Sequence, residues 1–344
     1  MPAPGDAPRA ATRNDVARLA GVSSAVVSYV LNDGPRPVAE ATRARVLAAI
    51  AELGYRPNAT ARALRLRSTR TLALLVPDIG NPFFAELAKA VQTAAFARGY
   101  AVTYGDTEYD PERERAQLAA LAERQPDGVL VIGGTPGTLA PLQAAGVPVV
   151  TLDRSGASGL PGPAGEPPSV GIDDEAAARA GIRHLQRHGH ERIALIAGPE
   201  DSPAALARRR AWTELVGPTA GAGGLDRLVA SAEYRREGGY RAALELLDRG
   251  GAPTAVFVSA DVQAIGALRA FAERGVRVPG ELAVLSFDGT SEAEFTSPPL
   301  SVIRQPLDAI ADATLELLLD GTAPRHVLVP HELVERESCG PHPD

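Results

Sequence analysis

The sequence predicts an α/β fold in two parts, a small all-helical head followed by a larger body built on parallel sheets. Residues 12–54 show apolar residues at helical spacing, whereas from Thr71 onward short apolar runs alternate with helical stretches. The balance of charge also changes at about residue 70. Residues 1–70 hold 11 arginines and 5 acidic residues, and the rest of the 344-residue chain holds 24 basic and 37 acidic residues. Positive charge gathered on a small head is typical of a nucleic-acid-binding module joined to a separate sensor.

Composition argues against several other classes of protein. The chain is 45% hydrophobic and 22% charged, without a run of about 18 apolar residues, so we expect no membrane segment and no membrane partner. The first residues carry proline, glycine and acid where a signal peptide needs a basic start and an apolar stretch. Cys339 is the only cysteine, so we expect no internal disulfide and no cysteine zinc site. We therefore expect a cytoplasmic protein that begins with a disordered arm over residues 1–11.

The head is predicted to contain three short helices. Thr12 and Asp15 form a capping-box pattern at the start of the first helix, which ends at Gly21. Ser23 can cap a second helix, and a third is expected over about residues 39–53. The apolar residues of these last two helices that we expect in a shared core are Val27, Val30, Leu31, Val46, Leu47, Ile50 and Leu53. Two helices joined by a glycine-containing turn are typical of a helix-turn-helix unit, although periodicity alone also allows an ordinary three-helix bundle with a basic surface.

The body is predicted to alternate strands and helices. Apolar runs with the length of strands are Leu72–Val76, Gly128–Ile132, Val147–Leu152, Arg192–Ile196, Ala255–Ser259 and Leu282–Phe287. The helical stretches between them are Phe84–Arg98, Glu112–Glu123, Asp174–His188, Ala204–Val216, Arg236–Asp248 and Val262–Gly275. Such alternation predicts a parallel sheet with helices on both faces. Ligands of such sheets bind beyond the carboxyl ends of the strands.

Two stretches of the head, DVARLAGVSSAVVSYVLND and TRARVLAAIAELGYRPNATARAL, closely resemble the DNA-binding head and hinge of the lactose-repressor (LacI/GalR) family. The resemblance runs without a gap from Thr12 to about Leu64. In the body, LLVPDIGNPFFAEL, HLQRHGHERIALIAG and VLVPHELVERES look like the two-lobed, type I periplasmic-binding-protein-like domain that this family carries behind its head. Together the similar stretches cover nearly the whole chain.

The resemblance implies both a division of the chain and a function. The implied parts are a helix-turn-helix head at 12–57, a hinge helix and linker at 58–70, and a two-lobed effector-binding and dimerisation domain at 71–340. Within that domain the implied lobes are about 71–169 and 170–300, with 301–323 returning to the first lobe. The implied function is that of a sequence-specific DNA-binding transcriptional regulator, a repressor, controlled by a small sugar-like metabolite bound between the lobes.

We expect a homodimer on a near-palindromic operator, because a two-fold dimer reads two half-sites. The stretch from Glu337 to Asp344 has no apolar heptad of the kind that tetrameric members of the family append. The resemblance places Ser24, Ala25 and Tyr29 toward base edges, and a hinge leucine, here Leu64, between base pairs of the minor groove. Leu64 as a linker residue that packs on the body is the alternative. The other implied DNA-binding residues are Thr12, Ser23, Ser28, Asn32, Tyr55, Asn58 and Ala61.

The resemblance also implies an effector site. Its residues would be Asp78, Asn81 and Phe83 in the first lobe and Ser202, Arg208, Asp261 and Asp288 in the second. Arg208 and Asp288 offer donors and acceptors for hydroxyl groups, and Phe83 offers an apolar face for a sugar ring. The alternative is that Arg208 and Asp288 merely pair with each other. Ala260 stands where many members of the family carry asparagine, which removes one ligand hydrogen bond.

No residue pattern points to catalysis, a cofactor or a metal. The glycine-rich stretch 133–137 lacks the Gly-Lys-Ser/Thr ending of a nucleotide-binding loop. His184 and His188 share a helix face at a spacing that metals can use, but no acidic pattern accompanies them and we expect a structural role. Two rival functions, an exported sugar-binding protein and a sugar-modifying enzyme, both leave residues 12–64 unexplained. The sequence therefore predicts no enzyme.

Overall fold

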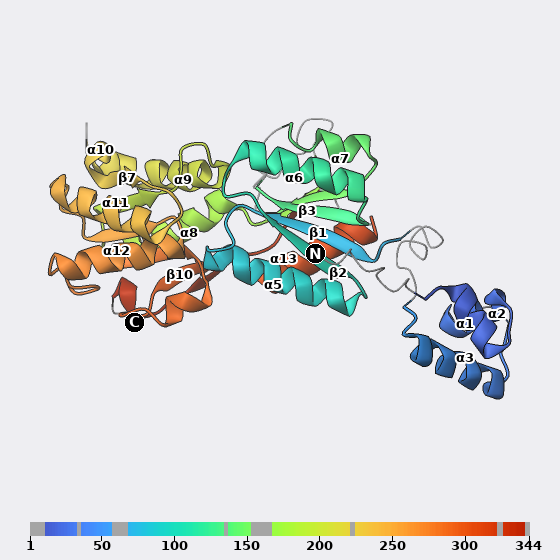
Figure 1. Cartoon of the computed structure of the whole chain (residues 1–344). Helices are drawn as coiled ribbons and strands as arrows, with labels where there is room; N and C mark the ends of the chain where they lie inside the picture. The colour runs from blue at the N-terminus through green and yellow to red at the C-terminus, as the bar shows by residue number, and fades with distance from the viewer. Residues whose placement is uncertain are drawn as a thin grey trace, which may run out of the picture. The chain divides into compact units, whose positions relative to one another are not determined.

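The computed structural model of the chain describes residues 11–32, 36–56, 68–133, 137–152, 167–220, 224–321 and 326–340. The chain divides into two compact units, Met1–Thr69 and Arg70–Asp344, which Figure 1 draws together. The first unit holds the helical head, and the second holds the body.

The head contains the three expected helices, α1 (Arg13–Ala20), α2 (Ser24–Asn32) and α3 (Glu40–Leu53). The predicted capping box is confirmed: the Asp15 carboxylate accepts a hydrogen bond from the Thr12 backbone N–H at 2.9 Å, and the Thr12 hydroxyl accepts one from the Asp15 backbone N–H. Helix α1 ends at Gly21, whose φ of 65° lies in the left-handed region that favours glycine. Local sequence signals thus define both ends of α1.

The small core of the head has one difference from expectation. The fully buried residues are Val16, Ala17, Ala20, Val27, Val30, Val46 and Ala49. Leu31, Ile50 and Leu53 pack partly buried against them, but Leu47 is 49% exposed, so its expected place in the core is wrong. At 3.6 residues per turn, Leu47 lies about 100° around α3 from Val46 and therefore outside the side of the helix that packs in the core.

The body is built on two six-stranded sheets. The first sheet has the order β11-β5-β4-β3-β1-β2, and its strands are β1 (Thr71–Val76), β2 (Ala101–Asp106), β3 (Gly128–Ile132), β4 (Val149–Leu152), β5 (Ser169–Gly171) and β11 (His326–Leu328). The second has the order β12-β10-β9-β8-β6-β7, and its strands are β6 (Ile193–Ala197), β7 (Val229–Ser231), β8 (Ala255–Val258), β9 (Ala283–Asp288), β10 (Ser301–Arg304) and β12 (Glu332–Val334). The strand pairs are parallel except β10 with β12.

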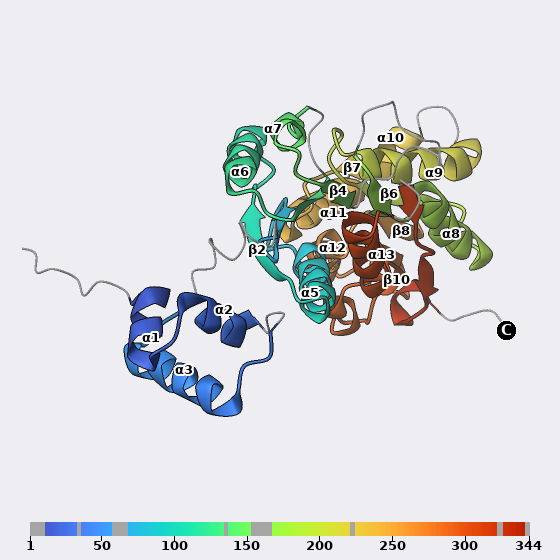
Figure 2. The same cartoon turned by 90° about the vertical axis from the view of Figure 1, so that its right-hand side faces the viewer.

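Helices cover both faces of each sheet. In the first lobe they are α5 (Pro82–Ala97), α6 (Pro111–Arg124), α7 (Ala140–Ala144) and α13 (Leu307–Leu319). Figure 2 shows α6 and α7 on one side of this sheet and α5 on the other. Alternate residues of β1 follow the two faces: Leu74 belongs to the cluster that includes α5, whereas Leu75 packs with Leu118 of α6 and Leu142 of α7. The parallel-sheet prediction for the body is therefore correct.

The second lobe carries α8 (Asp174–Arg187), α9 (Pro203–Ala220), α10 (Leu225–Leu228), α11 (Arg236–Asp248) and α12 (Asp261–Glu273), together with the short 3-10 helices η2 (Ser291–Glu294) and η3 (Glu337–Cys339). Helices α11 and α12 approach so closely that a Cβ added to Gly266 would lie 1.9 Å from the Arg236 carbonyl oxygen. A glycine is therefore required at that contact.

The described chain crosses between the lobes after β5, after β10 and after β11. The expected return to the first lobe at about Ser301 is wrong. Residues 301–304 form β10, a strand of the second sheet paired parallel with β9, and α13 is the first element back in the first lobe. Ser301, Val302 and Ile303 are fully buried in the second lobe, so this strand belongs to the core of that lobe. No helix of the described residues is long and apolar enough to span a bilayer.

Candidate functional site

Helix α2 presents a buried face and a solvent face. Val27 and Val30 are buried in the head, whereas Ala25 is exposed and Ser24 and Tyr29 are half-buried. Of the three residues that were predicted to face base edges, Ala25 is therefore directed to solvent, and Ser24 and Tyr29 are partly accessible. Small side chains at two of these positions allow the helix backbone to come near a binding surface.

The other predicted DNA-binding residues differ in how they are held. Ser23 is exposed and its hydroxyl accepts from the Val26 backbone N–H, which places it at the start of α2. Tyr55 packs partly buried against the core of the head. The Thr12 hydroxyl donates to the Asp15 carboxylate at 2.6 Å, so Thr12 also serves to begin α1. Ser28 is half-buried on α2. The Asn32 side chain and the residues Asn58, Ala61 and Leu64 lie outside the described residues.

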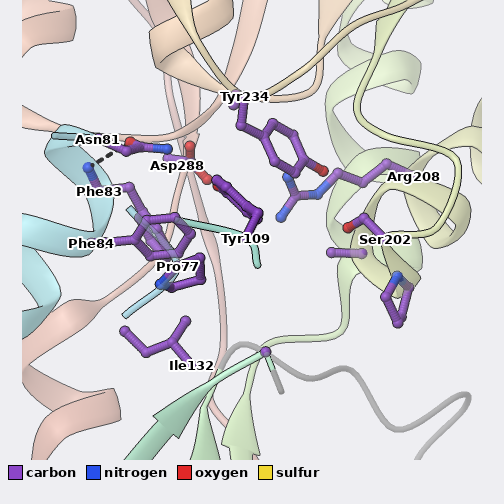
Figure 3. A pocket seen from close by; sticks show the side chains of 14 residues that line it. Pro77, Asn81, Phe83, Phe84, Tyr109, Ile132, Ser202, Arg208, Tyr234 and Asp288 are labelled. Carbon is purple, nitrogen blue, oxygen red and sulfur yellow. Dashed lines mark hydrogen bonds between the residues drawn. The ribbon is translucent and has the colours of Figure 1, made fainter. Parts of the chain in front are cut away.

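A cavity of about 110 Å³ lies in the body where strands of both sheets end (Figure 3). Its lining follows the carboxyl ends of β1, β2 and β3 in the first lobe and of β6, β7, β8 and β9 in the second. This is the place where open parallel sheets bind ligands. The lining residues are Pro77, Asn81, Phe83, Phe84, Tyr109, Ile132 and Gly133 from the first lobe, and Ser202, Pro203, Ala204, Arg208, Tyr234, Ala260 and Asp288 from the second.

The first lobe contributes a mostly aromatic wall. Phe83 and Phe84 meet edge to face with ring centroids 5.3 Å apart at the start of α5. The Asn81 side-chain oxygen caps that helix by accepting from the Phe83 backbone N–H at 3.1 Å, which directs the Asn81 amide nitrogen to the cavity (Figure 3). Tyr109 follows β2 with a φ of 58°, a left-handed conformation that is uncommon for a tyrosine and often marks a functional loop.

The second lobe contributes a charged wall, of which Arg208 is the centre. Its guanidinium group donates to the Asp174 carboxylate at 2.9 and 2.7 Å and to the Ser259 carbonyl at 2.6 Å. It also lies over the Phe287 ring, 3.7 Å from the centroid. Arg208 is 3% exposed and Asp174 is 1% exposed, so this is a buried ion pair. The arrangement holds the planar group in one orientation at the cavity (Figure 3).

Asp288 is the acidic residue of the cavity. It ends β9 with a φ of 110°, a conformation strained for any side chain. Gln305 stabilises this conformation, since its backbone N–H donates to the Asp288 carbonyl at 2.9 Å and its amide donates to the Asp288 carboxylate at 3.1 Å. Gln305 lies between β10 and α13, where the chain passes from the second lobe to the first. The hydrogen bonds from Gln305 therefore join Asp288 to one of the segments that link the lobes.

Two residues of the expected effector set do not line the cavity. The Asp261 carboxylate accepts from Ser286 and, at 2.6 Å, from the Thr290 backbone N–H, and its burial raises its pKa to about 6. In the structure this carboxylate holds the loop after β9, and its contact with a ligand stays a prediction. Asp78 follows β1 of the first lobe, and one of its carboxylate oxygens lies 3.6 Å from a guanidinium nitrogen of Arg235 in the second lobe.

Among the lining residues that sequence reasoning missed, those with large side chains are Phe84, Tyr109, Ile132 and Tyr234. Two of these follow strands that it also missed, Tyr109 after β2 and Tyr234 after β7. Ile132 ends a strand that was predicted, so the carboxyl-end rule would have found it. Phe84 adjoins Phe83 in the first turn of α5, which begins at Pro82. The structure shows that both side chains line the cavity, which the sequence alone does not indicate.

Comparison with known proteins follows the same division of the chain. Residues 12–58 match the bacterial regulatory proteins of the lacI family, and residues 182–339 match the periplasmic binding protein-like domain. The HTH-type transcriptional repressor CytR of Escherichia coli K12 is 34% identical over 92% of this chain and 92% of its own length.

Two solved structures extend the similarity. The chain of the transcriptional regulator CelR–cellobiose complex is 32% identical, with a TM-score of 0.69 over 95% of this chain and 99% of that one. The lac repressor dimer bound to operator and the anti-inducer ONPF is 26% identical, with a TM-score of 0.83 over 97% of this chain and 100% of that one. These relatives are regulators of transcription and not enzymes. The chain belongs to the lacI family of bacterial regulatory proteins.

Proposed function

We propose that this protein is a homodimeric repressor that binds a near-palindromic operator through α2 and the segment around Leu64, and that a small sugar-like ligand in the body cavity changes its affinity for that operator. CytR is a repressor by name, and the lac repressor structure contains a dimer on operator DNA. Because its partner is DNA, we propose that the protein acts in the cytoplasm.

The ligand class is argued from the cavity. At about 10–15 Å³ for each water-sized group, the 110 Å³ cavity accommodates on the order of ten such groups, about the size of a monosaccharide. Phe83, Phe84 and Tyr109 offer flat apolar surfaces to a ring, and Arg208 and Asp288 offer a fixed donor and a fixed acceptor to its hydroxyl groups. The single observation that supports the proposal most is that one cavity combines aromatic rings with an oriented arginine and an aspartate. The cellobiose complex of CelR and the ligand ONPF of the lac repressor structure agree with a sugar-like occupant.

Control of DNA binding requires that the ligand favour one arrangement of the lobes. The cavity draws lining residues from both lobes, so a ligand that contacts both walls favours the arrangement in which the walls are close. Coupling between two such sites is typically worth about 1–3 kcal/mol, or about 5-fold to 150-fold in affinity. We propose that this coupling acts through the hinge segment at 58–70.

The rival functions are an exported sugar-binding protein and a sugar-modifying enzyme. Either would use the cavity, but neither accounts for a helix-turn-helix head with a solvent-facing α2. DNA binding by the full chain therefore discriminates between them and the proposed repressor.

The experiment has two stages. The full chain is first heated with pentoses, hexoses, cellobiose, galactosides and nucleosides, because a ligand at 100 times its Kd stabilises the fold by about 2.7 kcal/mol. DNA that flanks the coding region is then titrated by gel shift with and without each stabilising compound, and footprinting of the complex maps the protected half-sites. The proposal predicts protection of two half-sites and a ligand-dependent change in affinity. Protection of one half-site, or no specific DNA complex, would overturn it.

A further inference from the structure

The structure brings two histidines and the cysteine together in the second lobe, away from the cavity. His184 and His188 lie one turn apart at the end of α8, and Cys339 closes η3 near the other end of the sequence. One ligand atom of each of the three residues lies within 4.8 Å of the others. His184 and Cys339 are each 1% exposed, whereas His188 is half-buried and reaches the surface.

The distances in this cluster fit a tetrahedral metal. The His184 Nε2 atom lies 3.4 Å from the Cys339 Sγ atom. With zinc bonds of about 2.0–2.1 Å to nitrogen and about 2.3 Å to sulfur, two tetrahedral ligands of these types stand about 3.6 Å apart. The imidazole rings of His184 and His188 have centroids 4.3 Å apart, and the ligand atoms of all three residues lie within 4.8 Å of one another, close enough to share one ion after adjustment of the side chains. Two nitrogens and one sulfur are a ligand set that favours zinc over magnesium or calcium.

Neighbouring groups orient the ligands as they do in known metal sites. The His184 Nδ1 atom lies 3.3 Å from the Glu335 carboxylate. A proton on Nδ1 donates to that carboxylate and leaves the Nε2 lone pair directed at Cys339. The Ser301 hydroxyl lies 3.0 Å from the Cys339 Sγ atom and can donate to a thiolate there. Such carboxylate–histidine–metal arrangements fix the tautomer and strengthen binding.

We propose that His184, His188 and Cys339 form a binding site for a divalent transition-metal ion, with Zn²⁺ as the expected occupant and water as its fourth ligand. The Cys339 thiol releases its proton to solvent as the sulfur–metal bond forms. The ion would tie η3 to α8 across 155 positions of sequence. This revises the sequence-based expectation that the chain holds no metal and that these histidines are only structural.

The same groups do not suit nucleophilic chemistry. A thiol, an imidazole and a carboxylate in a row are also the parts of a cysteine nucleophile. Cys339, however, is 1% exposed, whereas a reactive cysteine is accessible to its substrate. Metal coordination is the chemistry that a buried thiol beside two imidazoles supports.

The test uses the untagged, reduced, full-length chain after removal of metals with a chelator. Zn²⁺ is titrated in competition with a chromophoric chelator, and Co²⁺ is titrated in parallel because a thiolate ligand produces a charge-transfer absorption band. The ligand variants are Cys339→Ser and His188→Gln. The matched control is His190→Gln, since His190 follows the same helix but directs its Nδ1 atom to the Thr254 hydroxyl at 3.1 Å.

We expect one Zn²⁺ per chain, a thiolate band with Co²⁺, and affinity lowered at least tenfold in both ligand variants but unchanged in His190→Gln. Glu335→Gln should lower the affinity about 10-fold to 100-fold while it keeps the Co²⁺ band. Circular dichroism establishes that each variant is folded, and His188→Gln at the half-buried position keeps the test valid if the buried cysteine cannot be changed. Absence of saturable binding, a missing thiolate band, or equal loss in the His190 control would overturn the proposal.

Discussion

The two lobes of the body have the same strand order, yet they line the cavity with different chemistry. The order β5-β4-β3-β1-β2 in the first sheet corresponds to β10-β9-β8-β6-β7 in the second. The first lobe contributes Phe83, Phe84 and Tyr109, whereas the second contributes Arg208 and Asp288 beside one aromatic residue, Tyr234. One topology can therefore provide a ring-binding wall in one lobe and a hydroxyl-selecting wall in the other. In the second lobe, buried hydrogen bonds with Asp174 and Ser259 hold Arg208 in place. In the first lobe, the Asn81 cap at the start of α5 positions Phe83 and Phe84.

The largest expected effect concerns the charged wall. Arg208→Met should lower the free energy of unfolding by about 3–5 kcal/mol, because it leaves the Asp174 carboxylate buried without its cation. Urea denaturation measures this loss. Removing both partners, in Arg208→Met with Asp174→Leu, should restore most of it.

The neighbouring arginine is the control for that change. Arg209 lies 3.6 Å from Glu200, and both side chains are well exposed. Arg209→Met should alter the free energy of unfolding by no more than about 0.5 kcal/mol. Equal losses of unfolding free energy in Arg208→Met and Arg209→Met would contradict the view that the buried ion pair of the charged wall stabilises the second lobe.

Asp288→Asn should weaken ligand binding by about 10-fold to 100-fold, because hydrogen bonds to a charged group contribute about 1.5–3 kcal/mol. Asparagine tolerates the positive φ at this position, and it can still accept from Gln305. Calorimetry with the ligand found in the thermal screen measures the change. Asp248→Asn, at an exposed ion pair with Arg274, is the matched control and should bind ligand as the wild type does.

A smaller effect is expected in the aromatic wall. Phe83→Leu should weaken ligand binding about threefold to tenfold, because it removes a ring face but keeps an apolar side chain. Phe96→Leu changes the same helix at a site that is 81% exposed, and it should have no effect on binding. If Phe83→Leu were more damaging than Asp288→Asn, the assignment of selectivity to the second lobe would be wrong.

The smallest effect concerns a contact between the two lobes, outside the cavity lining. The Glu86 carboxylate of α5 accepts from the Ser291 backbone N–H at 2.9 Å and from its hydroxyl at 2.6 Å, which joins the two lobes. Glu86→Gln should weaken ligand binding about twofold to fivefold by favouring separated lobes. Glu292→Gln removes a contact with Arg236 inside the second lobe, and calorimetry should find its ligand affinity unchanged. Identical effects of the two variants would exclude a role for the contact between lobes.

The same contrast explains which features could be predicted from sequence. Strands buried on both faces, such as β3 and β6, read as continuous apolar runs and were found. The edge strand β2 was missed because its residues are exposed or half-buried, and the lining residue Tyr109 was missed with it. The helix caps of the head are local signals, so α1 was predicted correctly from Thr12 and Gly21.

Side-chain partners distant in sequence could not be predicted. The pairing of Arg208 with Asp174 joins α9 to the start of α8, and the contact of His184 with Cys339 joins α8 to η3. No periodicity carries information on such contacts, because both depend on how separate elements pack. The family resemblance placed Arg208 at the cavity but did not indicate that it also stabilises the lobe.

The central claim, that the cavity controls DNA binding, is tested most directly by titrating a fluorescent operator fragment with wild type and Asp288→Asn, each with and without ligand. The account predicts at least a fivefold change of operator affinity with ligand in the wild type. It also predicts the same operator affinity without ligand in both proteins, and a ligand response shifted to about 10-fold to 100-fold higher concentration in the variant. An unshifted response in Asp288→Asn, or a ligand that binds the cavity without changing operator affinity, would contradict it.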